Sequence, residues 1–433
     1  MSGAPEFTIE INQNPYLPMG GHEVHAVAHI RASGPPTGVR AGARGAEVIM
    51  VDSSGSMDFP STKLKAAKQA TKAAIDTLRD GTLFAVVSGT GMASMVYPFE
   101  EGLVAADERT RKEAKREVDK LRARGGTAMG QWLLMARRLL EPHKDAIRHA
   151  ILLTDGKNES EREQDLAEAI AYCEGVFVCD CRGIGLDWRV EEVRKISTAL
   201  LGDIGLVSEP ADLVADFTRM MQNAMGKSVA DVTLRVRTIN NARVKYVKQT
   251  YPVIDDLTAR RTEVGPNVGD YPTGSWGGES KHYHVCLEVE PDEVNPGGKR
   301  RPCQISVVLP DGAGGLELAK AGVFAQWTDD EELSTRINQE VAKVTGREKL
   351  ANAVQEGLQA RRDGDETTAT ARLVQALELA NEAGDEHTAR LLGRVVEVEA
   401  DGTSRLRNDD DEGMMIIDVE SHKTARVGPP IEG

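Results

Sequence analysis

An aspartate and two serines stand at alternate positions directly after an apolar run. The run from Val48 to Val51 is partly β-branched, and Asp52, Ser54 and Ser56 follow it. This pattern predicts a buried parallel strand that delivers oxygen ligands at its carboxyl end. Because the three side chains offer only hard oxygen donors, they suit Mg²⁺, or Mn²⁺ or Ca²⁺, rather than Zn²⁺ or copper.

Two later segments carry oxygen ligands that are placed to complete such a site. Thr127 follows a pair of glycines between two expected helices, and Asp155 ends a second apolar run that begins at Ile151. Loops at the carboxyl ends of neighbouring parallel strands converge. We therefore expect one site that is formed by Asp52, Ser54, Ser56, Thr127 and Asp155.

A simpler interpretation of the first segment is a helix N-cap with a turn, because Asp and Ser are favoured capping residues. The presence of all three segments in the right order favours the metal site. The neighbouring Asp58 and Glu159 are expected to be solvated charges at its rim.

The five residues resemble the metal-ion-dependent adhesion site of von Willebrand factor type A domains. All five motif positions are present in the family's order, and the resemblance spans roughly residues 46 to 225. It implies that Ser54 and Ser56 bind the metal directly and that Asp52 and Asp155 do so partly through water. Thr127 would bind directly or through water, depending on the state of the domain.

The resemblance further implies a ligand-binding domain of the bacterial intracellular type. Its metal keeps one position open for an Asp or Glu carboxylate from a protein partner, and no catalysis is implied. The alternative is a Mg²⁺-dependent, phosphatase-like hydrolase that uses Asp52. Such enzymes resemble haloacid dehalogenases, which place a second Asp where this chain has Ser54. No His, Lys or Glu stands out as a general acid or base, so the sequence favours binding.

The composition argues against some classes of binding partner and indicates a cellular compartment. A chain of 433 residues is long enough for two or three domains. A net charge of −15 and an aromatic content of 4% argue against nucleic acid and against anionic membranes as partners. We expect a cytoplasmic protein, because the sequence has neither a leader nor an apolar run long enough to span a membrane.

The fold class expected is α/β, with a doubly wound Rossmann-like domain over residues 46–226. Strands in 1–45 and 227–328 are expected to form one β-sandwich, into which the metal domain is inserted. Helical hairpins are expected over 329–400, separated by breaks at Gly346, Gly364 and Gly384, and an acidic flexible tail over 401–433.

Several residues outside the metal motif could have a functional role, but we expect each of them to have a structural one. His25 and His29 are expected on one strand face about 13 Å apart, too far to share an ion. All five cysteines are expected to be reduced packing residues. Trp276 is expected to anchor its glycine-rich loop rather than contact a partner.

The tail suggests two further interactions. Thr424 lies in a segment that resembles the phosphothreonine motifs bound by forkhead-associated domains. The acidic run from Asn408 to Glu412 is a candidate source of a carboxylate for the metal, from the same chain or from another copy.

Overall fold

The structure is a computed structural model, and it describes residues 5–33, 44–291, 298–310, 315–398, 404–407 and 410–424. The chain forms two compact units. Unit 1 consists of Met1–Ala4, Pro35–Ala230 and Gly274–Gly277, and unit 2 consists of Pro5–Gly34, Asp231–Thr273 and Gly278–Gly433. Most of unit 1 is therefore inserted, in sequence, between two parts of unit 2.

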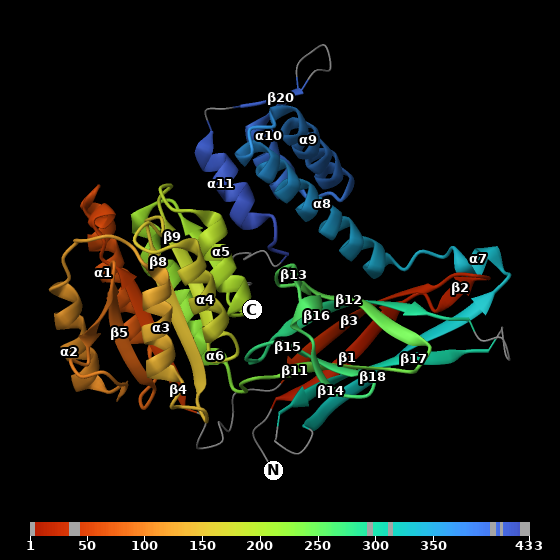
Figure 1. Cartoon of the computed structure of the whole chain (residues 1–433), viewed down its shortest axis with the longest axis horizontal. Helices are drawn as coiled ribbons and strands as arrows, with labels where there is room; N and C mark the ends of the chain where they lie inside the picture. The colour runs from red at the N-terminus through yellow and green to blue at the C-terminus, as the bar shows by residue number, and fades with distance from the viewer. Residues whose placement is uncertain are drawn as a thin grey trace, which may run out of the picture. The chain divides into compact units, whose positions relative to one another are not determined.

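Unit 1 is built on a seven-stranded sheet (Figure 1) in the order β10-β9-β8-β4-β5-β6, with β7 also paired to β5. Five strands are parallel, whereas β6 and β7 run antiparallel to β5. The bounds are β4 Gly45–Asp52, β5 Leu83–Gly89, β6 Ala93–Tyr97, β7 Val104–Ala105, β8 Ile147–Thr154, β9 Val178–Ile184 and β10 Ile204–Val207.

Helices cover both faces of this sheet, as the alternation of strands and helices predicts. On one face, α1 (Thr62–Thr77) packs against α2 (Glu108–Asp119) and α6 (Leu213–Gly226). The other face carries α3 (Met129–Leu140), α4 (Glu163–Cys173) and α5 (Val190–Ala199). The central strand β4 is buried on both faces, which explains its uninterrupted apolar run. The expected doubly wound α/β fold class is confirmed.

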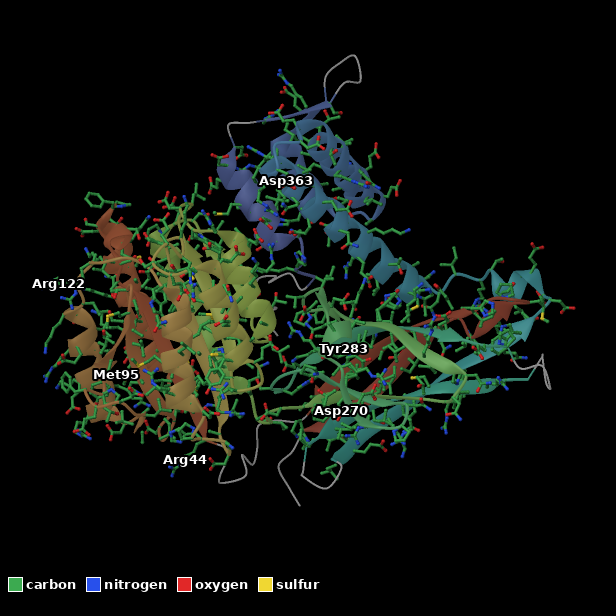
Figure 2. The ribbon with its side chains drawn as sticks, in the orientation of Figure 1. Arg44, Met95, Arg122, Asp270, Tyr283 and Asp363 are labelled. Atoms are coloured by element: carbon green, nitrogen blue, oxygen red, sulfur yellow. The ribbon has the colours of Figure 1, made fainter. Side chains whose placement is uncertain are left out.

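Unit 2 contains two sheets, and each combines strands from before and after the inserted unit. The five-stranded sheet has the order β1-β3-β16-β12-β13, and the six-stranded sheet has the order β14-β15-β11-β17-β18-β2. Tyr283 of the first sheet and Asp270 of the second are labelled in Figure 2. The bounds are β1 Glu6–Gln13, β2 Tyr16–Pro18, β3 Glu23–Ser33, β11 Thr233–Thr238, β12 Ala242–Tyr251, β13 Asp255–Asp256, β14 Thr262–Gly265, β15 Val268–Pro272, β16 Ser280–Val289, β17 Arg300–Leu309 and β18 Leu316–Thr328.

The carboxyl-terminal part of unit 2 is helical and differs from the sequence prediction at one glycine. Gly364 and Gly384 end helices with positive φ angles of 81° and 66°, as expected. Gly346 does not end a helix, because α8 continues through it. One glycine costs a helix only about 1 kcal/mol, and the packing of α8 outweighs that cost. The bounds are α7 Glu331–Ser334, α8 Gln339–Arg362, α9 Glu366–Glu382 and α10 Glu386–Val395.

The described part of the expected tail, residues 404–407 and 410–424, contains a short strand and a helix. After the hairpin of β19 (Val396–Val398) and β20 (Ser404–Leu406), α11 spans Asp411–Glu420 and contacts α8 and α10. Asp410 caps this helix by accepting a hydrogen bond from the backbone N–H of Gly413. The apolar residues Met414 and Ile417 are buried in the helical core rather than in a strand. Within the described ranges, no helix has the length and apolar character of a membrane span.

Candidate metal centre

The loop after β4 is held in a compact turn by its own side chains. Asp52 is fully buried, and its Oδ1 accepts a hydrogen bond of 2.8 Å from the backbone N–H of Ser54. The hydroxyls of Ser54 and Ser56 lie 2.9 Å apart. Ser56 donates a hydrogen bond of 2.7 Å to Asp155 Oδ1, and Thr154 donates one of 2.6 Å to Asp52 Oδ2. The loops after β4 and β8 therefore meet through their carboxylates.

Backbone hydrogen bonds bring the Thr127 loop to the same place. The N–H of Gly55 donates to Gly125 O at 2.9 Å, and the N–H of Arg124 donates to Ser53 O at 2.8 Å. On the other side, the N–H of Ser160 donates to Thr127 O at 2.9 Å. The three loops are thus tied together without the help of any ligand.

Gly156 shows where the oxygens converge. A Cβ atom built on this glycine lies 3.2 Å from the hydroxyl oxygens of both Ser56 and Thr127 and 3.8 Å from Asp52 Oδ2. Oxygens of the β4 loop and of the Thr127 loop therefore converge in front of this glycine, which belongs to the third loop. Ser56 is exposed, so this space opens to solvent on one side.

The spacing of the oxygens fits a small octahedral cation. Mg–O bonds of 2.0–2.1 Å place adjacent ligands of an octahedron about 2.9 Å apart. The separation between the Ser54 and Ser56 hydroxyls is 2.9 Å, and that between Ser56 Oγ and Asp155 Oδ1 is 2.7 Å. The donor set of carboxylates and hydroxyls, without sulfur or nitrogen, is the one that Mg²⁺ prefers.

A buried lysine balances part of the negative charge. Lys63 of α1 is 5% exposed, and its ammonium donates to Asp155 Oδ2 at 2.9 Å and to Asp187 Oδ2 at 3.1 Å. Burial opposes the charge on Lys63, but the hydrogen bonds to the two carboxylates outweigh it and raise the pKa of the amine. Lys63 therefore occupies one oxygen of Asp155 and leaves the other facing Ser56.

Burial also acts on Asp52. It raises the pKa of this carboxyl group to about 6, and the hydrogen bonds from Ser54 and Thr154 limit the rise. The nearby Asp155 adds to the shift because like charges disfavour ionisation. A divalent cation would relieve both effects, since it stabilises the ionised form.

All five predicted site residues come together, and the structure adds others that the sequence did not suggest. Lys63 is followed by three more lysines, Lys65, Lys68 and Lys72, and nothing in the sequence distinguishes it from them. Thr154 is the last residue of β8 and carries no functional signal in the sequence. Asp58 and Glu159 are exposed, as expected for rim charges.

Comparison with known proteins agrees with this architecture. A family model of the von Willebrand factor type A domain matches residues 46–203, and a model of the von Willebrand factor type A C-terminal domain matches residues 378–421. No protein of curated function matches the chain.

Two solved structures match the chain over nearly its whole length. A von Willebrand factor type A protein from Catenulispora acidiphila is 48% identical, with 98% of each chain covered and a TM-score of 0.93. The ArnB paralog VWA2 from Sulfolobus acidocaldarius is 12% identical, with 97% of this chain and 98% of that chain covered and a TM-score of 0.62, which shows a shared fold. The first of these matches, together with the doubly wound sheet, shows that the chain belongs to the von Willebrand factor type A family.

Proposed function

We propose that the protein is a metal-dependent interaction module that binds one Mg²⁺ ion through Asp52, Ser54, Ser56, Thr127 and Asp155. When bound, the ion supplies a Lewis-acidic position to which a carboxylate oxygen of a protein partner can bind. The observation that carries this proposal is the convergence of oxygens in front of Gly156, where Asp52, Ser56 and Thr127 meet and where Asp155 accepts a hydrogen bond from Ser56. Because Ser56 is exposed, this space opens to solvent beside it.

Some residues of the site contribute charge to metal binding, and others fix the orientation of the ligands. Asp52 and Asp155 supply negative charge, and Lys63 neutralises part of it. One inner carboxylate therefore remains uncompensated against a doubly charged ion, which leaves net positive charge for an incoming Asp or Glu. The hydrogen bonds from Ser54 and Thr154 fix the orientation of the Asp52 carboxylate before an ion arrives.

Exposed apolar residues surround this edge of the sheet. Phe59 follows the β4 loop and is 79% exposed, and Met92 follows β5 and is 71% exposed. Leu186, which follows β9, is 44% exposed. Large exposed apolar side chains beside a polar site are typical of protein interaction surfaces. They favour a protein partner over a small carboxylate ligand.

The surroundings of Asp52 do not favour the hydrolase alternative. Both carboxylate oxygens accept hydrogen bonds within the fold, and the residue is fully buried. A nucleophilic carboxylate needs an oxygen that faces the substrate. A Mg²⁺-dependent phosphatase activity that Asp52→Ala abolishes while the fold is retained would reverse this preference.

The phosphothreonine interaction remains a separate prediction. Thr424 donates its hydroxyl to Thr250 O at 2.8 Å, and its N–H donates to Pro252 O at 2.8 Å. Phosphorylation of Thr424, and recognition by a forkhead-associated domain, would require that this segment be released first. Part of the acidic run that was expected to supply a carboxylate, Asn408 and Asp409, lies outside the described residues.

Calorimetry with Mg²⁺ and a pull-down from lysate test the proposal together. Thr127→Ala removes one hydroxyl ligand from the rim of the site, and we expect it to weaken Mg²⁺ binding at least about 10-fold. Partner retention should fall in parallel and should vanish in chelator. Asp58→Asn is the matched control, because Asp58 is exposed and follows the same loop, and it should change neither measurement.

A third variant distinguishes the contribution of the surrounding surface to partner binding from the contribution of the metal. Phe59→Ser should weaken partner retention while Mg²⁺ affinity stays unchanged, because Phe59 offers no ligand atom. If wild-type protein bound no Mg²⁺, or bound it equally well after Thr127→Ala, the proposed site would be wrong.

A further inference from the structure

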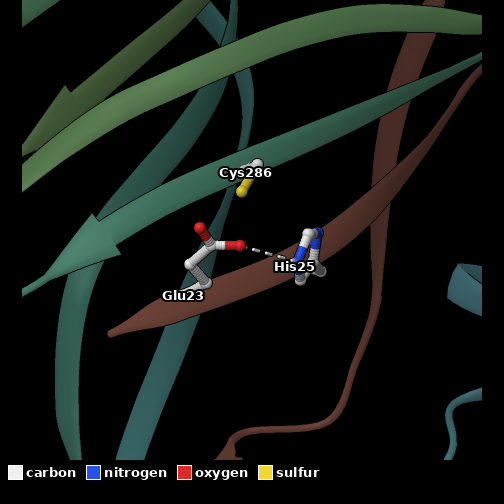
Figure 3. A group of neighbouring side chains, drawn as sticks. All are labelled: Glu23, His25 and Cys286. Atoms are coloured by element: carbon white, nitrogen blue, oxygen red, sulfur yellow. Dashed lines mark ion pairs between the residues drawn. The ribbon is translucent and has the colours of Figure 1, made fainter. Parts of the chain in front are cut away.

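Unit 2 contains a second group of metal-ligating side chains, far in sequence from the first. Glu23 and His25 lie on β3, and Cys286 lies directly opposite His25 on the neighbouring strand β16. Figure 3 shows the three side chains on one face of this sheet. One ligand atom from each residue lies within 4.8 Å of the other two. The sequence predicts that His25 does not share an ion with His29 and that Cys286 is a packing residue, but it does not show that strand pairing brings His25 and Cys286 together.

Hydrogen bonding fixes which nitrogen of His25 faces this group. The buried His284 contacts Glu348 Oε1 through Nδ1 at 2.7 Å. Burial opposes ionisation of Glu348, but the hydrogen bonds and charges of His284 and Lys248 together outweigh it and lower the pKa of the carboxyl group, so the carboxylate accepts and His284 Nδ1 donates. On its other side, His284 Nε2 lies 3.2 Å from His25 Nδ1. This contact leaves His25 Nε2 as the ring nitrogen that faces Glu23.

The second ring nitrogen of His25 faces a carboxylate. His25 Nε2 lies 3.6 Å from Glu23 Oε2, while Lys245 pairs with the other oxygen, Oε1. A ring nitrogen, a carboxylate oxygen and a sulfur thus converge within 4.8 Å of one another, as the ligands of a single cation must.

We propose that Glu23, His25 and Cys286 form a Zn²⁺ site in unit 2, separate from the Mg²⁺ site of unit 1. One sulfur, one imidazole nitrogen and one carboxylate oxygen form a donor set that suits Zn²⁺ and disfavours Mg²⁺. Three protein ligands leave a fourth tetrahedral position for water.

The geometry requires only a small adjustment. Tetrahedral zinc with bonds of 2.0–2.3 Å places its ligand atoms about 3.3–3.8 Å apart. The 3.6 Å between His25 Nε2 and Glu23 Oε2 already lies in this range. Rotation of Glu23 towards the sulfur breaks its contact with Lys245, and water can take over that contact because the Glu23 side chain is 47% exposed. Tyr246 lies beside the site, with its hydroxyl 3.4 Å from His25 Nδ1 and 3.5 Å from His284 Nε2.

The hydrogen bond from His284 to Glu348 orients the imidazole ring of His284, which in turn contacts His25. A carboxylate that orients a histidine pair stabilises the ligand nitrogen in the correct tautomer. Metal binding also requires that Cys286 lose its proton, because the thiolate is the ligand. Uptake of Zn²⁺ should therefore release one proton. The bound ion would join β3, which precedes the inserted unit, to β16, which follows it.

Cobalt absorption spectroscopy on the full-length protein tests this site. Co²⁺ replaces Zn²⁺ in such sites and gives a sulfur-to-cobalt charge-transfer band, to which the sulfur-free site of unit 1 cannot contribute. In excess Mg²⁺, we expect one equivalent of Co²⁺ to produce the band and Zn²⁺ to remove it. His25→Ala should weaken Co²⁺ binding at least about 10-fold.

Two cysteine variants provide the control. Cys286→Ser should abolish the band, whereas Cys303→Ser should retain it, because Cys303 is equally buried but lies on β17 outside this group. The absence of a band from wild-type protein, or its survival in Cys286→Ser, would overturn the proposal. Circular dichroism of each variant shows whether a lost band reflects a lost fold.

Discussion

At the scale of single residues, the candidate metal centre depends on a charge balance that its motif does not reveal. Lys63 contacts Oδ2 of the Asp155 carboxylate, while Ser56 contacts its Oδ1. Its charge makes the site stable before any ion binds. The same positive charge weakens the attraction of the site for Mg²⁺. Lys63 therefore stabilises the metal-free site and lowers the affinity of the site for Mg²⁺.

Replacement of Lys63 by Met separates these two effects. We expect Lys63→Met to lower the free energy of unfolding in chelator by about 3–5 kcal/mol, because it leaves a buried carboxylate without a partner. Added Mg²⁺ should raise the melting temperature of the variant more than that of the wild type, since the ion then supplies the missing positive charge. Thermal unfolding with and without Mg²⁺ measures both quantities.

Lys65→Met is the matched control for that experiment. Lys65 is on the same helix but is exposed, and its replacement should change neither the melting temperature nor its response to Mg²⁺. Equal Mg²⁺ responses in Lys63→Met and wild type would contradict the idea that Lys63 opposes the ion.

At the scale of elements, a buried histidine links three strands of the unit 1 sheet. His149 of β8 contacts Glu47 of β4 through Nδ1 at 2.6 Å and Asp180 of β9 through Nε2 at 3.2 Å. These residues lie near the amino ends of the strands, at the opposite edge from the metal centre. Burial opposes the charge on His149, but Glu47 and Asp180 outweigh it and raise the pKa of the imidazole to about 10.

This contact predicts how the stability of unit 1 depends on pH. The folded pKa of His149 lies above the unfolded value of about 6.5, so its contribution is complete below about pH 6.5 and is lost as the pH rises through about 10. We expect wild-type protein to lose more unfolding free energy between pH 7 and 10 than His149→Gln does. At pH 7 the variant should be less stable by about 3–5 kcal/mol, because two carboxylates lose their cation.

Urea unfolding at several pH values provides the measurement. Other groups that titrate in this range are shared by both proteins and cancel in the difference. His143→Gln serves as the control, because His143 lies outside the cluster and its replacement should leave the pH profile unchanged. Parallel profiles for wild type and His149→Gln would show that the imidazole does not carry this charge.

The elements that the sequence predicted best are those with local signals. The apolar run of β4 and the convergence of the loops that carry Asp52 and Asp155 both follow from periodicity and motif. Contacts that depend on strand order did not follow, since nothing near His149 or Cys286 in sequence indicates which strand lies beside it. The contact between Lys63 and Asp155 did not follow either, because Asp155 is contributed by another loop. A buried ion pair can be identified only when the fold shows that the two charged residues lie side by side.

At the scale of the whole molecule, the division into units does not follow the order of the sequence. The segment Gly274–Gly277 lies within the strand-rich part of the chain, yet it belongs to unit 1. Trp276 is fully buried there, as expected for a loop anchor, and it exchanges backbone hydrogen bonds of 2.8 Å and 3.0 Å with Val229. A Cβ on Gly277 would lie 2.4 Å from Gly226 O, so this segment packs tightly against the end of α6.

This assignment predicts which unit weakens when Trp276 is removed. We expect Trp276→Ala to destabilise unit 1 by about 3–5 kcal/mol and to lower its melting temperature by about 6–20 °C. The transition of unit 1 is identified by calorimetry as the one that Mg²⁺ raises, because a ligand stabilises only the unit that binds it. Trp327 on β18 of unit 2 is equally buried, and Trp327→Ala should lower the other transition instead. If Trp276→Ala lowered only the transition that does not respond to Mg²⁺, the segment would belong to unit 2, as its position in the sequence suggests.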